Sequence, residues 1–413
     1  MAEERASGRG GLRALLEDEG RFWPAFATLC GVVALLKGLR LPNLWAATQA
    51  QFDYSDGFIR RGLFGEILGL LHVHHYVPFA VFSYGVLLGL CLLLWRYAWR
   101  ERSAAGLRGA AVTVFFSSFA LSYLADLAGY LDIALALLTV GFLLTPNVRA
   151  RMVLAPLVVV GGILIHEVFA IVFFPVVWLR LLLDVPAGQE APERKRRMIY
   201  AGALLVFAVV TTGVVALAPA VPRGGAALLE QHVAQRVDFP VRQDVFAVLH
   251  RSARVNLAIM VTYFYPRGRY WFRQLQAALV FWPSAGFFLW LALRGLERGV
   301  AAARRKFLEP WVLTAALAPL LMNLVGWDVF RWGALMVLTA FLTLLMVEQA
   351  VGGAAVWPTG VAWQRAAMVL IALNLASGVG FLDGYRTGTL PFPELTHAWS
   401  LFLQTHHLVL PAH

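Results

Sequence analysis

The chain has 413 residues, of which 60% are hydrophobic and 14% charged, with a formal net charge of +11 and a mean hydropathy of +0.68. A soluble core of this length could not bury so much apolar surface, and a membrane β-barrel would show short segments of alternating hydrophobicity. The apolar runs are instead continuous and about 20 residues long. The composition therefore predicts an all-α, polytopic transmembrane helical bundle.

The positive charge does not indicate a nucleic-acid partner, because most of the basic residues lie between the apolar runs. The two cysteines, Cys30 and Cys91, both lie inside apolar runs. Neither a disulfide framework nor a thiolate metal site is therefore expected.

In chain order, the polar residues 1–21 are predicted to form a cytoplasmic N-terminal segment, and residues 22–381 a transmembrane domain of about eleven spans. Two long outer loops are expected at 43–76 and 219–275, and an outer C-terminal tail at 382–413. The spans are expected at residues 22–41, 77–95, 109–125, 131–146, 152–166, 168–183, 198–218, 276–293, 310–326, 332–348 and 366–381.

Basic residues concentrate in alternate loops. By the positive-inside rule these loops are cytoplasmic, and their arginines are expected to be mostly solvated. They hold Arg96, Arg100, Arg102, Arg108, Arg149, Arg151, Arg194, Lys195, Arg196, Arg197, Arg294, Arg298, Arg304, Arg305 and Lys306. The other loops are then extracytoplasmic, and charged groups from five places in the sequence are expected to line one outer cavity. These groups are Asp53, Asp56, Arg60, Arg61, Asp126, Asp132, His166, Glu167, Asp328 and Arg331.

The densest of these places is the stretch FDYSDGFIRRGLFGEIL at residues 52–68. Its periodicity predicts an amphipathic interfacial helix over residues 57–71, capped by Asp53 or Asp56. In a structural role, Arg60 and Arg61 would contact lipid phosphates. In a functional role, one of the aspartates would take a proton from a hydroxyl group while the two guanidinium groups hold a phosphate.

Three shorter outer turns contribute further candidates. Asp132 is either a favourable charge at a helix N-terminus or part of the site. His166 and Glu167 stand together inside an apolar run, which favours hydrogen bonding or proton transfer; no HExxH pattern indicates a metal. Asp328 and Arg331 are three residues apart, so they are expected to pair on one helix face, either as a structural salt bridge or as substrate-binding groups.

The long 219–275 loop shows periodic stretches that predict one or two helices lying across the outer surface. Its aromatic residues, from Tyr263 to Phe272, indicate an interfacial belt or a surface for sugar rings and phosphates. The sequence contains no Walker A motif and no GxGxxG motif, so no nucleotide cofactor is expected. No metal site is predicted, and the metal dependence is left open.

The chain resembles integral-membrane glycosyltransferases of the GT-C type in its layout. A first span leads to an acidic outer loop with an interfacial helix, and some ten spans follow. The 52–68 stretch is also similar to bacterial envelope-polysaccharide membrane proteins. The resemblance implies a polyprenyl-phosphate sugar donor and an outer aspartate as general base, at Asp53 or Asp56. The long outer loop between the seventh and eighth spans is more similar to that of O-antigen polymerases and ligases, so the reaction subtype stays open.

The sequence therefore predicts a bacterial inner-membrane glycosyltransferase that moves a sugar or oligosaccharide from a lipid-linked donor to an outer acceptor. Its expected partners are membrane lipids, the polyprenyl-linked glycan and other polysaccharide-assembly membrane proteins. Arg60, Arg61 and Arg331 are the expected phosphate ligands, and His166 with Glu167 would orient a substrate. A transporter or flippase for an anionic lipid-linked substrate, and a non-catalytic assembly subunit, are the alternatives.

Overall fold

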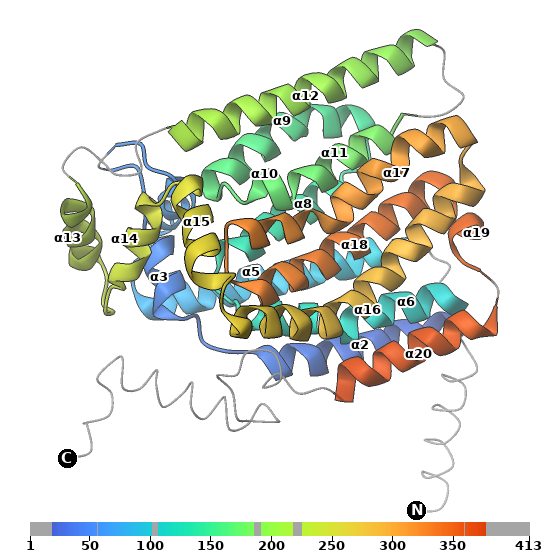
Figure 1. The fold of residues 1–413 in the computed structure, drawn as a ribbon, viewed down its shortest axis with the longest axis horizontal. Helices are drawn as coiled ribbons and strands as arrows, with labels where there is room; N and C mark the ends of the chain where they lie inside the picture. The colour runs from blue at the N-terminus through green and yellow to red at the C-terminus, as the bar shows by residue number, and fades with distance from the viewer. Residues whose placement is uncertain are drawn as a thin grey trace, which may run out of the picture.

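The computed structural model describes residues 19–55, 57–100, 106–185, 191–217, 225–358 and 360–376. Throughout these ranges the chain is helical and contains no strand. Figure 1 shows that most of the long helices run along the long axis of the molecule, side by side in one bundle. The prediction of an all-α membrane bundle is confirmed.

Within the described ranges, seven helical segments are long and apolar enough to cross a membrane. They are Tyr76–Ala98 (α5), Gly106–Asp126 (α6 and α7), Val148–Ile165 (α9), Pro192–Leu217 (in α12), Gly268–Gly299 (α16), Ala302–Leu324 (α17 and a 3-10 turn) and Val329–Val351 (α18). These seven correspond to seven of the predicted spans.

The prediction of eleven spans is not confirmed, because the other four correspond to helices that are shorter or more polar. These are α2 (Glu19–Gly38), α8 (Leu131–Leu144), α20 (Val361–Ala376), and the pair α10 (Phe169–Val172) and α11 (Phe174–Leu183). The 14 residues of α8 extend only about 21 Å, against about 30 Å of hydrocarbon. The pair α10 and α11 is interrupted at Phe173.

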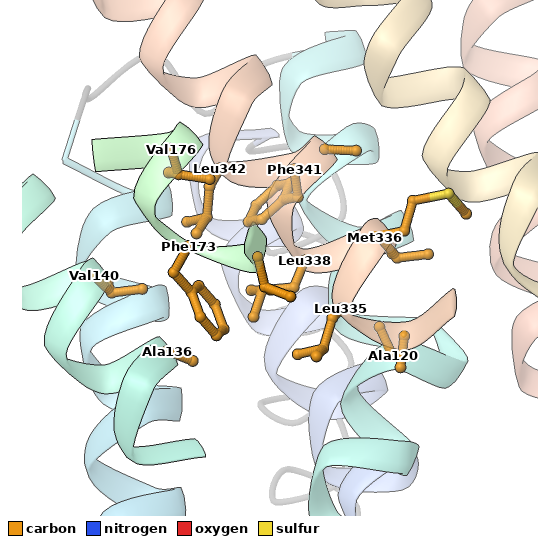
Figure 2. Packing of buried hydrophobic residues seen from close by; sticks show 14 of the residues in the cluster. Ala120, Ala136, Val140, Phe173, Val176, Leu335, Met336, Leu338, Phe341 and Leu342 are labelled. Carbon is orange, nitrogen blue, oxygen red and sulfur yellow. The ribbon is translucent and has the colours of Figure 1, made fainter. Parts of the chain in front are cut away.

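The core of the bundle is built around α18, which is buried along nearly its whole length. It packs against α7, α11, α16 and α17. Figure 2 shows leucines of α18 near Ala136 and Val140 of α8 and near Phe173 and Val176. By contrast, α12 lies at the edge of the bundle (Figure 1) and leaves Val206, Val209 and other apolar side chains exposed. Apolar side chains exposed in this way are suited to contact lipid.

The two ends of the bundle differ. One end, called the α13 end below, carries α3 (Leu44–Ala50), α4 (Gly62–Leu70), α13 (Ala226–Arg236) and α14 (Gln243–His250) (Figure 1). Here α13 and α14 cover residues 44–59 through a small separate core that includes Phe52, Ile59 and Phe246. The opposite end, the α19 end, carries α19 (Gly353–Val356) and the turn between α16 and α17.

The long loop of residues 219–275 contains α13, α14 and α15 (Ala253–Ile259), and α16 already begins at Gly268. The helix predicted over residues 57–71 is shorter than expected. It begins at Gly62, and Arg61 is its N-cap, in the left-handed conformation with φ 66°. Gly57 also has a positive φ, of 107°. The chain therefore turns twice before α4, so Arg60 and Arg61 precede the helix and Asp53 does not cap it, whereas Asp56 lies outside the described residues.

The position of α4 depends on Gly65, which lies directly against the backbone of the preceding segment. A Cβ atom at this position would overlap the carbonyl oxygen of Phe52, whereas one at Gly69 would have no atom closer than 3.9 Å. We expect Gly65→Ala to destabilise the fold by about 1–3 kcal/mol, because backbone must move to admit the methyl group. Thermal unfolding in detergent checks this, and Gly69→Ala is the matched control. Equal unfolding temperatures of the two variants would contradict the prediction.

Candidate functional site

The site at the α13 end begins with an ion pair between two helix N-termini. Asp132 lies in the first turn of α8 and is completely buried, and Arg331 lies in the first turn of α18. Their Oδ2 and Nη2 atoms are 2.7 Å apart. A buried carboxylate requires such a counter-charge, since desolvation strongly disfavours an isolated ion. The pair therefore fixes the starts of α8 and α18 against each other.

A second ion pair joins the N-cap of α4 to the turn between α9 and α10. The guanidinium group of Arg61 donates through Nε to both carboxylate oxygens of Glu167, at 3.1 and 3.0 Å, and also through Nη2. Burial alone would raise the pKa of Glu167, but the charge of Arg61 and its hydrogen bonds to the carboxylate hold the pKa well below its ordinary value. Glu167 is therefore a carboxylate near neutral pH.

His166 lies beside this carboxylate and is buried. Its Nδ1 atom is 3.2 Å from Glu167 Oε2 and 3.3 Å from the backbone N–H of Val168. Burial and the Arg61 guanidinium lower the pKa of the imidazole, although the charges of Glu167 and Asp132 act in the opposite direction. A neutral imidazole has one nitrogen free to accept a proton.

Asp328 does not form the predicted ion pair. It lies just before α18 and accepts a hydrogen bond from the hydroxyl group of Tyr123 at 3.1 Å, while Arg331 pairs with Asp132 of another helix. Burial raises the pKa of Asp328, and Arg331 and Tyr123 partly offset this. Spacing along one helix could not reveal that α8 supplies the closer carboxylate.

The ring of Tyr130, just before α8, lies near the guanidinium group of Arg331. The guanidinium carbon lies 5.6 Å from the Tyr130 ring centroid, and the Tyr130 hydroxyl accepts a hydrogen bond from Asn43 at 3.0 Å. Asp126 pairs with Arg40 at 3.6 Å. The two ion pairs and the imidazole that their charges act on are called the inner cluster below: Arg61, Asp132, His166, Glu167 and Arg331.

Asp53 belongs to a separate group. It accepts hydrogen bonds from the backbone and hydroxyl of Ser55, at 3.1 and 2.5 Å, and it forms an ion pair with Arg236 at the end of α13. Burial would raise its pKa, but Ser55 and Arg236 together lower it. The other predicted base, Asp56, lies outside the described residues.

Arg236 is a residue that the sequence did not single out for the site, because the arginines of the 219–275 loop carried no distinguishing pattern. Its Nη2 also donates to the carbonyl oxygen of Gln51 at 3.1 Å. The arginine therefore attaches the end of α13 to the segment before α4. Arg60 is different, since it makes no ion pair with any described residue, and its Nε atom is buried without a hydrogen-bond partner.

The arginines of the α19 end correct a further expectation. Arg108 and Arg151 were expected in solvent, but both are only 2% exposed. Arg108 pairs with Glu348 at 2.6 Å, and Arg151 pairs with Asp184 at 2.7 Å. On this side the helices α6 and α9 begin earlier than the predicted spans, so the two arginines expected in loops lie in helices within the packed interior.

No group of three His, Cys, Asp or Glu side chains placed to hold a metal ion occurs in the described part of the chain. The inner cluster instead offers two guanidinium groups, two carboxylates and a neutral imidazole within a buried, apolar setting. Such a combination can hold an anion, accept a proton and counter developing charge.

The Arg61–Glu167 pair predicts a defined pH dependence. Because the folded state lowers the pKa of Glu167, the carboxylate stabilises the fold above its unfolded-state pKa, and this stabilisation is lost as pH falls through the lower folded-state value. The difference in unfolding temperature between the wild type and Glu167→Gln should be constant from about pH 8 to about pH 5 and shrink in more acidic buffer. Thermal unfolding across this range is the measurement. A difference that grows on acidification would contradict the assignment.

Comparisons of the chain with protein-family models, curated proteins and solved structures gave no match.

Proposed function

We propose that the chain is a glycosyltransferase of the bacterial inner membrane that uses a sugar donor carried on a polyprenyl phosphate or pyrophosphate. The observation that supports this best is the inner cluster, where one ion pair joins α8 to α18, a second joins the N-cap of α4 to the α9–α10 turn, and the charges of both act on the His166 imidazole. Ionisable groups inside a membrane bundle are costly, so their gathering at one end favours a site. The proposal includes a GT-C-like arrangement, a cytoplasmic N-terminus and an outward-facing α13 end.

In this proposal the donor phosphate is bound by Arg60, whose buried Nε lacks a partner among the described residues. The acceptor hydroxyl gives its proton to a base as its oxygen attacks the anomeric carbon. The bond from that carbon to the phosphate oxygen breaks, and the phosphate leaves with the electron pair. Arg60 and Arg61 stabilise the charge that develops on this leaving group.

The geometry favours His166 over Asp53 as the base. Burial and Arg61 lower the pKa of the His166 imidazole, which favours the neutral form, and the Glu167 carboxylate, 3.2 Å from Nδ1, would stabilise the imidazolium that forms when the ring takes up a proton. Asp53 has a lowered pKa, and Ser55 and Arg236 occupy its carboxylate. A carboxylate held in this way is a weaker proton acceptor, and its contacts fit a role in attaching α13.

The test compares native cells carrying His166→Gln, Asp53→Asn or a deletion. Outer-leaflet glycans are labelled on intact cells with a membrane-impermeant reagent, and the extracted polyprenyl-phosphate pool is then analysed by mass spectrometry. If the proposal holds, the deletion and His166→Gln accumulate an unused donor on the outer leaflet, at unchanged protein level, and Asp53→Asn accumulates less. A donor trapped on the inner leaflet would instead identify a flippase. An unchanged pool in the deletion would overturn the proposal.

A further inference from the structure

A second feature lies on the outside of the bundle, between α11, α12 and α17. Both α12 and α17 pack against α11 but share few contacts with each other. Figure 1 shows α12 along one edge of the molecule, with α11 and α17 on its inner side. The surface of α11 therefore forms the floor of a groove that opens toward the surrounding lipid, and two cavities lie along it.

The cavity at the α19 end has a volume of about 840 Å³, and each of the three helices contributes an arginine to its wall. These are Arg180 of α11, Arg194 of α12 and Arg304 of α17. Among the described residues that line this cavity, one is acidic: Asp184, just after α11. Three guanidinium groups against one carboxylate give the cavity a positive charge.

The carboxylate of Asp184 does not cancel this charge, because it is already engaged. Arg151, which lies behind the cavity wall, holds it at 2.7 Å, and Arg180 contacts it at 3.1 Å. Arg180 also donates to Gln349 at 2.8 Å, while its Nε is buried without a partner. Arg304 donates to the carbonyl oxygen of Val185, which leaves its remaining N–H groups for an anion.

The second cavity follows the first along the same three helices and is almost entirely apolar. Its volume is about 330 Å³, and its walls include Trp178, Val209 and Trp311. The two tryptophan rings meet edge to face at 4.2 Å. On α17 the two cavities extend from Arg304 to Thr314, which corresponds to about 15 Å of helix. This is about the depth of the hydrocarbon of one leaflet.

We infer that this groove is a binding site for an anionic phospholipid. Its phosphate lies among Arg180, Arg194 and Arg304, and one acyl chain extends along the two tryptophans. A basic cavity between membrane helices, with an apolar cavity further along the same helices, matches a molecule with a charged head and an apolar tail. The site lies at the opposite end from the inner cluster, and it does not depend on the proposed glycosyltransferase activity.

The test is native mass spectrometry of the detergent-purified full chain titrated with phosphatidylglycerol or phosphatidylcholine. Phosphatidylglycerol should bind more tightly, and Arg194→Gln should weaken its binding about fivefold. Lys195→Gln removes the same charge one residue away, outside the cavity wall, and should have no effect. Arg304→Gln is a second variant, on another helix, with the same expected loss. Equal affinity for the two lipids, or equal effects of the residue 194 and 195 variants, would overturn the inference.

A second pair of variants tests the apolar part and separates lipid from free phosphate. Val209 lines the apolar cavity, and Val210, which is also exposed on α12, does not. Val209→Trp should fill the channel and reduce phosphatidylglycerol binding several-fold more than Val210→Trp. If both variants bind like the wild type and millimolar inorganic phosphate displaces the lipid completely, the groove is an anion site without a tail channel and the inference fails.

Discussion

Replacing Arg331 by methionine is expected to destabilise the protein by about 3–5 kcal/mol, because it leaves a buried carboxylate without its counter-charge. Asp132 is completely buried and lies 2.7 Å from the guanidinium group. The loss should appear as a large fall in unfolding temperature and in the yield of monodisperse protein in detergent. No other substitution considered for the inner cluster is expected to reduce stability as much.

Two controls make this prediction specific. The exposed pair of Arg242 and Asp244, whose closest atoms are also 2.7 Å apart, should tolerate Arg242→Met within about 1 kcal/mol. The double variant Asp132→Leu with Arg331→Met removes both charges and should recover most of the lost stability. A double variant as unstable as Arg331→Met alone would show that the two residues act independently of their ion pair.

Arg60→Gln is expected to reduce glycosyl transfer by about 10²–10³-fold while leaving the fold almost as stable as before. The activity loss follows from removing a charge that stabilises the leaving phosphate. The fold is spared because Arg60 has no ion-pair partner among the described residues. The measurement is the turnover of the lipid-linked donor in reconstituted vesicles, together with thermal unfolding of the same preparation.

For Arg60→Gln the matched control is Arg242→Gln, which removes an exposed arginine whose partner, Asp244, is two residues away. It should retain nearly full transfer activity. If Arg60→Gln transfers sugar at the wild-type rate, Arg60 is not the phosphate ligand. If it unfolds at a much lower temperature than the wild type, its role is structural.

The fold class was predictable because long apolar runs have few alternatives in a membrane. The end of the bundle at which most candidate residues lie was also predictable, since consecutive spans alternate in direction. The shorter helices were harder, because α8 and the broken pair of α10 and α11 are as apolar as true spans. Their breaks nevertheless carry local signals: Gly129, with a φ of 91°, precedes α8, Pro146 follows the C-cap of α8, and Pro175 lies in the first turn of α11.

The contacts within the site were much less predictable. Nothing local indicates that Arg61 adopts a positive φ, a conformation uncommon for any residue except glycine. The helical spacing predicted an ion pair between Arg331 and Asp328, whereas the observed partner of Arg331, Asp132, belongs to a helix distant in the sequence. The pairing of Arg236 with Asp53 likewise joins residues 183 positions apart. Such pairings are set by how the helices pack, which local sequence does not encode.

The buried pair of Arg108 and Glu348 has a consequence for how the protein is made. Its two residues are 240 positions apart, and α6, which carries Arg108, is buried throughout. While the chain is being synthesised, α6 enters the membrane long before α18 exists to neutralise its arginine. Until then, the local contacts of Arg108 in the described residues are the carbonyl oxygen of Ala98, which accepts a hydrogen bond at 2.7 Å, and the Trp99 ring, whose centroid lies 5.9 Å from the guanidinium carbon. A nascent chain that stops before α18 therefore keeps the Arg108 charge at the start of α6 without its carboxylate partner, so this helix reaches its final environment only when the last long span has been made.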